Sequence, residues 1–128
     1  MVFALEQFSD IALLILRFAI AAIFFYHALP KLKNAGMMAQ MTGIPVSMVF
    51  LLGMVEFFSS LGMIFGIYIQ VAALLLSVVM IGAIGMKIIK WSVPFAAMDK
   101  TGWEFDLILL AANLVILVNG GGGMVLSA

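Results

Sequence analysis

Four long apolar stretches, separated by short polar ones, dominate the pattern of this chain. They cover about residues 8–29, 47–67, 70–89 and 104–118. Because a helix rises ~1.5 Å per residue, the first three are long enough to cross a hydrocarbon core of about 30 Å. The fourth is short and would run close to the membrane normal or thin the bilayer locally. None shows the polar/apolar alternation of barrel strands, which favours helices.

The breaks between the stretches indicate how the helices connect. Pro30 is expected to end the first helix, and Gly43-Ile44-Pro45 leads into the second. The turn at 66–69 is so short that the second and third helices must be antiparallel neighbours. The sequence therefore predicts an all-α, polytopic membrane protein: one domain over residues 1–128, built as an antiparallel bundle of four transmembrane helices.

Composition supports the membrane assignment. The chain is 66% hydrophobic and only 9% charged, whereas soluble domains carry roughly 25% charged residues. Its net charge is zero, without a basic cluster, so the expected partner is the lipid bilayer and no nucleic acid. The absence of cysteine excludes disulfides, iron–sulfur clusters and cysteine nucleophiles, and one histidine cannot build a His-rich metal site. We expect neither a metal nor a covalently bound cofactor.

The basic residues predict the orientation. All five lysines lie at the ends of the odd-numbered stretches or in the loops 30–46 and 90–103 that follow them. The positive-inside rule therefore places both loops in the cytoplasm and both termini outside. The N-terminus lacks the basic cluster of a secretory signal, so the first stretch is expected to be a retained span.

Two opposite charges interrupt the first two apolar stretches. Glu56 lies in the middle of the second, where a carboxylate is costly unless it is compensated, and Arg17 has a comparable position in the first. Counted from the predicted cytoplasmic boundary, Glu56 lies about 13 Å deep and Arg17 about 18 Å. A long arginine side chain covers this offset, which predicts an Arg17–Glu56 ion pair. The pair has two readings: it takes part in chemistry, or it is a structural bridge that fixes the helix register.

The remaining polar residues form a second predicted layer. His27, Lys87, Glu104 and Asp106 fall within a turn or two of the cytoplasmic surface, and Asn113 shares a face with Asp106 at a depth of about 15 Å.

Two of these residues also have simpler interpretations. Glu104 ends the sequence Thr101-Gly102-Trp103-Glu104, which fits a helix capping box. His27 either satisfies a backbone carbonyl near the expected helix end, or exchanges protons, as histidine does readily near neutral pH.

Such a set of side chains in an apolar cavity suits a quinone, which has an apolar ring and two carbonyl groups. The candidate catalytic residues are His27, as donor to a carbonyl, and Glu56, as proton relay. The candidate substrate-binding residues are Arg17, Lys87, Glu104, Asp106 and Asn113. The same cavity could instead hold a small organic anion against Arg17 or conduct protons. No nucleotide-binding or serine-hydrolase motif is present.

Four short motifs, taken together in order and spacing, resemble the DoxX family of small membrane proteins. They are Leu16-Arg17-Phe18, Phe24-Phe25-Tyr26-His27-Ala28-Leu29-Pro30-Lys31-Leu32, Val55-Glu56-Phe57 and Gly102-Trp103-Glu104-Phe105-Asp106. The chain departs from the family where Ala28 replaces a typical glycine and where Ser59-Ser60 replace small glycines, and these residues are still small.

The resemblance implies a four-helix membrane fold and a redox context. Relatives include the membrane subunit associated with thiosulfate:quinone oxidoreductase. By motif match, the functional positions would be Arg17, His27, Glu56, Glu104 and Asp106.

Two functions therefore remain in view. The first is a quinone-linked membrane subunit, a homo-oligomer or part of a larger redox complex, in a prokaryotic cytoplasmic (inner) membrane. Its electron donor would sit on another chain. The alternative is a non-catalytic membrane partner or small transporter, in which the buried charges are structural or hold an anion.

Overall fold

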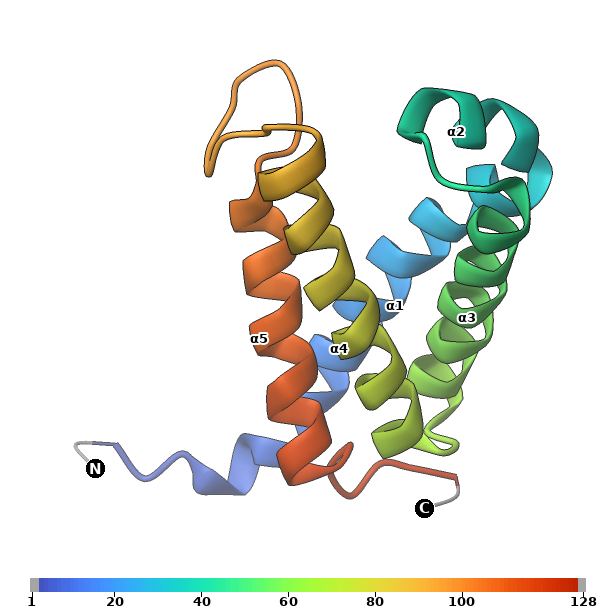
Figure 1. The fold of residues 1–128 in the computed structure, drawn as a ribbon. Helices are drawn as coiled ribbons and strands as arrows, with labels where there is room; N and C mark the ends of the chain where they lie inside the picture. Colours follow the sequence, from blue (N-terminus) through green and yellow to red (C-terminus); the bar gives the residue numbers. More distant parts are fainter. Residues whose placement is uncertain (1–2, 127–128) are drawn as a thin grey trace.

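The structure, a computed structural model, describes residues 3–126, and this part of the chain is helical without any strand (Figure 1). A short 3-10 helix, η1 (Glu6–Phe8), leads into α1 (Ser9–Lys33). The remaining elements are α2 (Ala35–Thr42), α3 (Val46–Phe65), α4 (Ile69–Gly85), the π-helical turn η2 (Met86–Lys90) and α5 (Trp103–Asn119).

Three helical segments are long and apolar enough to cross a membrane. They are Glu6–Lys33, Val46–Phe65 and Ile69–Lys90, with 28, 20 and 22 residues. They correspond to the first three predicted spans. The fourth predicted span corresponds to α5, which has 17 residues and is not among these three, so its crossing stays a prediction.

Two features of the first connection differ from the sequence-based expectation. Pro30 does not end the first helix: α1 continues to Lys33, because proline removes only one backbone hydrogen bond and the helix can close again beyond it. The predicted loop 30–46 also contains α2, formed largely by good helix formers such as Ala, Met and Gln. This helix ends at Gly43, whose φ of 76° is the left-handed conformation typical of a helix C-terminus.

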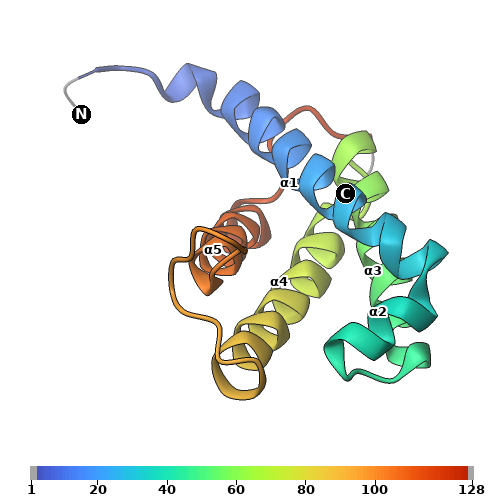
Figure 2. The ribbon, with the colours of Figure 1, turned by 90° about the horizontal axis from the view of Figure 1, so that it is seen from above.

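The helices associate as two pairs rather than as a uniform bundle. α1 packs mainly on α3, and α4 packs mainly on α5. The predicted tight turn between the second and third spans is present, since α3 ends at Phe65 and α4 begins at Ile69. The two pairs are close together at the end where the chain termini lie and diverge toward the opposite end (Figures 1 and 2).

The opposite end is called the lysine end, because all five lysines lie on the helix ends and connections there. It carries the connection through α2 and the loop 91–102 that joins η2 to α5 (Figure 1). The packed core, in contrast, draws together side chains of all four long helices, among them Phe24, Met63, Leu76 and Ile116, which are almost fully buried. This core joins the two pairs, and their divergence leaves space at the lysine end.

The start of α5 shows why the predicted capping box does not form. Gly102 is the residue before the helix, and no side chain caps it. Instead the backbone N–H groups of Trp103 and Glu104 donate to the carbonyls of Pro94 and Phe95, at 3.3 and 3.0 Å. The loop itself therefore satisfies the donors that Thr101 was expected to satisfy, and Glu104 is exposed.

We expect Gly102→Ala to destabilise this end of the protein. A methyl group at Gly102 would overlap the backbone of Phe95 and Ala96, and overpacking of this kind costs about 1–3 kcal/mol. Thermal unfolding followed by circular dichroism would measure the loss. Gly36→Ala is the matched control, because nothing lies within 4 Å of a methyl group there. Equal melting temperatures for the two variants would contradict the packing argument.

Candidate functional site

A cavity of about 580 Å³ lies between the two helix pairs near the lysine end. Every helix from α1 to α5 contributes to its walls, together with η2. Most of the lining is apolar, but five ionisable side chains face it: His27, Lys31, Glu56, Lys87 and Asp106. We call this space the polar cavity. Its size falls in the usual range for small-molecule sites, and a few polar groups on apolar walls are typical of them.

Lys31 and Glu56 form the first ion pair of the polar cavity. Lys31 Nζ lies 2.6 Å from Glu56 Oε2 and donates a hydrogen bond to it, and the Glu56 side chain is only 1% exposed. Gly53 lets the helices approach here, since a methyl group in its place would lie 2.9 Å from Lys31 Cβ. The lysine on α1 thus compensates the carboxylate that the sequence marked as costly.

Lys87 and Asp106 form the second ion pair. Lys87 Nζ lies 2.6 Å from Asp106 Oδ2, an ionic contact in which the oxygen is not in line for a directed hydrogen bond. Lys87 Nζ also donates to the carbonyl of Thr101 at 3.2 Å and lies 6.0 Å from the ring centre of Phe105. Lys87 belongs to η2, and π-helical turns of this kind are frequent at functional sites.

His27 lines the polar cavity together with the two ion pairs. Its ring centre is 5.7 Å from that of Phe105 and 5.7 Å from that of Tyr26. Among the residues that the structure describes, no hydrogen bond to the imidazole is found, so its nitrogens are available to a ligand. A proton donor beside two lysine–carboxylate pairs can bind a carbonyl oxygen and exchange protons with it.

The predicted Arg17–Glu56 ion pair is wrong. Measured from the helix ends at the lysine end, Arg17 lies 16 residues from Lys33 and Glu56 10 residues from Val46. The offset along the helices is therefore about 9 Å rather than 5 Å. The sequence-based depth was too small because it ended α1 at Leu29.

Arg17 instead binds backbone carbonyls near the chain termini. Its guanidinium, completely buried, donates to the carbonyls of Met63, Ile64, Gly121 and Met124 at 2.9, 3.4, 3.2 and 2.7 Å. Met63 and Ile64 belong to the last turn of α3, where carbonyls lack partners within the helix. Arg17 therefore joins the end of α3 to the C-terminal segment.

This segment, residues 120–126, is called the glycine strap. It lies across the ends of the helices, below them in Figure 1. Besides Arg17, it is held by Asp10, whose Oδ1 accepts a hydrogen bond from the N–H of Gly123 at 2.8 Å. The N–H of Leu126 donates to the carbonyl of Gly66 at 3.0 Å. The polar residues Asp10 and Arg17 on α1 thus hold the glycine strap against the helix ends by hydrogen bonds.

The predicted site residues divide into two groups. His27, Glu56, Lys87 and Asp106 come together in the polar cavity. Arg17, Glu104 and Asn113 do not line it. Asn113 is buried in α5, where its Nδ2 donates to the carbonyl of Leu109 at 2.9 Å.

Lys31 is the residue that the sequence-based interpretation missed. It was assigned to the basic residues that only set the topology. The signal that could have identified it is its spacing: Lys31 follows His27 by four residues, so both occupy one face of a helix. The expected break at Pro30 concealed this relation.

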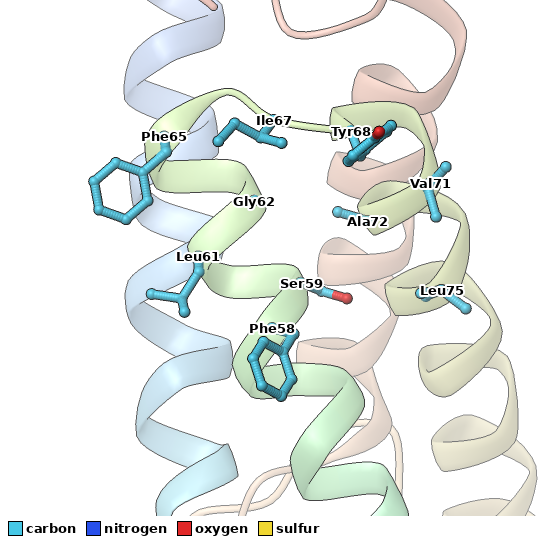
Figure 3. A pocket seen from close by; sticks show the side chains of 10 residues that line it. All are labelled: Phe58, Ser59, Leu61, Gly62, Phe65, Ile67, Tyr68, Val71, Ala72 and Leu75. Carbon is cyan, nitrogen blue, oxygen red and sulfur yellow. The ribbon is translucent and has the colours of Figure 1, made fainter. Parts of the chain in front are cut away.

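A second hollow has a different character. It is a groove of about 310 Å³ between α3 and α4 beside their connecting turn (Figure 3). Its lining is apolar except for Ser59, whose hydroxyl is directed into the groove in Figure 3, and Tyr68. No carboxylate, lysine or histidine reaches it. Chemistry that needs ionisable groups therefore belongs to the polar cavity. Within residues 3–126, no three His, Cys, Asp or Glu side chains are grouped to hold a metal ion.

A family comparison supports the resemblance over the part of the chain that contains the first three motifs. No curated protein and no solved structure matches the chain. The family model described as DoxX matches residues 12–91, more than half of the 128 residues. The matched region includes His27, Lys31, Glu56 and Lys87 of the polar cavity. On this match, the chain belongs to the DoxX family.

Proposed function

We propose that this protein is a membrane subunit of a quinone-linked redox system and that the polar cavity binds a quinone head group. The observation that carries the proposal is the composition of the cavity: apolar walls suited to a ring, with His27 and two lysine–carboxylate pairs facing it. Membership of the DoxX family, which is associated with membrane redox and quinone contexts, also supports a quinone-linked function.

Each polar side chain has a role in this proposal. His27 donates a hydrogen bond to one quinone carbonyl. Lys87 is available to the other, because its ammonium carries three protons and the carbonyl of Thr101 accepts a hydrogen bond from one of them. Reduction of a quinone to a quinol takes up two protons, and Glu56 is placed to relay them by way of Lys31. The electrons come from a redox group on another chain, since this one has no redox centre of its own.

The topology is part of the proposal. We infer that α5 crosses the membrane as the fourth span, in an antiparallel four-helix arrangement. η1 and the glycine strap lie at the same end of the molecule (Figure 1), which requires an even number of crossings. The positive-inside rule places the lysine end in the cytoplasm and the termini outside. The membrane is then the inner membrane of a prokaryote, and the protein acts as a homo-oligomer or within a larger redox complex.

Quinone binding can be measured through Trp91, which lines the polar cavity. In a Trp103→Phe background in lipid nanodiscs, decylubiquinone should quench the fluorescence of Trp91 saturably. His27→Leu should weaken this binding about tenfold, because leucine cannot donate the hydrogen bond to the ligand. Tyr26→Phe is the matched control, because Tyr26 adjoins His27 but is 73% exposed. Quenching that never saturates, or that is the same in both variants, would contradict the proposal.

The alternative function, a non-catalytic membrane partner, draws support from one observation. Both carboxylates of the cavity are paired with lysines of the same chain, so the charges compensate one another without any ligand. Under this alternative, Glu56→Gln lowers the amount of protein in the membrane and no quinone co-purifies. The sequence also allowed for a small anion bound to Arg17. The structure removes the support for this hypothesis, because the Arg17 guanidinium already donates to four backbone carbonyls.

A further inference from the structure

One wall of the polar cavity contains residues that are exposed at the surface of the helices. Met48 and Gly82 line the cavity although they are exposed, Met48 to 46%. Val78, which also lines it, is 60% exposed. Met48 lies on α3, and Val78 and Gly82 lie on α4. The gap between α3 and α4 is therefore apolar, and because both helices are candidate membrane spans, we expect it to face the bilayer.

At the lysine end the same gap is bridged. Trp91 Nε1 donates to the carbonyl of Thr42 at 2.9 Å, and Lys90 Nζ donates to the carbonyl of Gly43 at 3.1 Å. These two hydrogen bonds join the segment after α4 to the end of α2, across the opening between the helix pairs. A solute arriving from water on this side meets the bridge first, whereas a solute dissolved in the bilayer meets Met48, Val78 and Gly82.

We propose that the ligand of the polar cavity enters sideways from the bilayer, between α3 and α4, and that it is an amphiphile whose apolar tail stays in this gap. The proposal rests on the proposed function for the identity of the head group. It adds the access route and the requirement for a tail. Gly82 contributes no side chain to this gap, and no atom lies within 4 Å of a methyl group built there.

The distribution of polarity supports an amphiphile. The ionisable groups lie on α1, the middle of α3, η2 and α5, and the lining residues Met48, Val78 and Gly82 carry none. The polar head of an amphiphile can contact the ionisable groups of the cavity, while its apolar tail lies in the gap between α3 and α4. A volume of about 580 Å³ holds a head group and only part of a long tail, so the remainder extends into the bilayer.

The test fills the gap with a larger side chain. Gly82→Phe should be tolerated, because no atom lies within 4 Å of a methyl group built at Gly82. It should weaken decylubiquinone binding about tenfold, equivalent to roughly two methylene groups no longer buried. Binding of 2,3-dimethoxy-5-methyl-1,4-benzoquinone, the same head group without the decyl tail, should change less than about twofold. The readout is again the fluorescence of Trp91 in nanodiscs.

Gly85→Phe is the matched control. Gly85 lies on the same helix, is equally free of atoms within 4 Å, and does not line the cavity. Gly82→Leu is a second blocking variant in case the phenylalanine variant does not accumulate. Equal binding of decylubiquinone to the Gly82 and Gly85 variants would overturn the side entrance. If neither quinone quenches Trp91 even in the Trp103→Phe protein without a further substitution, the proposed function fails instead.

Discussion

Replacing Lys31 with methionine should destabilise the protein by about 3–5 kcal/mol, because the buried carboxylate of Glu56 would lose its counter-charge. Glu56 is 1% exposed, and the hydrogen bond of 2.6 Å from Lys31 is the one described for its side chain. Unfolding in detergent, followed by circular dichroism, would measure the change. The predicted loss is large since the substitution leaves a charge and removes only its partner.

Two further variants make this prediction specific. Lys33→Met removes a lysine in the same turn of α1, but Lys33 is exposed and has no described partner, so its stability should stay within about 0.5 kcal/mol of the unsubstituted protein. The double substitution Lys31→Met with Glu56→Gln should recover most of the loss, because it removes both charges. If the Lys31→Met and Lys33→Met variants have the same melting temperature, the ion pair does not stabilise the fold.

Replacing Arg17 with methionine should destabilise the protein at least as much, for a different reason. The substitution leaves four backbone carbonyls without their donor, and hydrogen bonds to a charged group are each worth about 1.5–3 kcal/mol. The glycine strap should detach, because Gly121 and Met124 both depend on Arg17. A lower melting temperature and faster digestion of the C-terminal segment by carboxypeptidase would report the two consequences.

The same variant distinguishes the two roles considered for Arg17. If Arg17 holds the strap, the folded fraction of Arg17→Met should bind decylubiquinone as the unsubstituted protein does. Asp10→Asn is the milder control, since an asparagine oxygen can still accept the hydrogen bond from Gly123. Unchanged stability together with lost quinone binding would reverse the assignment and return Arg17 to the ligand.

The local pattern of the sequence was sufficient for several features. Continuous apolar runs predicted helices because lipid leaves the backbone no other partners. Helical periodicity also predicted the correct face of α5, since Asp106 and Asn113 are both buried. On α2 the pattern failed, because eight residues within a loop are too few to show a periodicity.

Side-chain partners could not be read from the sequence in the same way. Arg17 and Glu56 were matched by depth, and an error of four residues in the end of α1 shifts a depth by about 6 Å. An error of that size is enough to match two residues as an ion pair although they lie in different sites. The strap partners of Arg17 lie more than one hundred residues away along the chain, a separation over which no local pattern carries information.

The sequence by itself determined that this chain is a helical membrane protein of the DoxX family, which residues are costly in lipid, and which face of each helix they occupy. Tertiary structure alone decided that Lys31 compensates Glu56, that Arg17 holds the glycine strap, and that a cavity opens between the helix pairs. The physical reason is that a helix fixes the direction of a side chain through its own hydrogen bonds. Helix ends, register and divergence depend on how separate segments pack together.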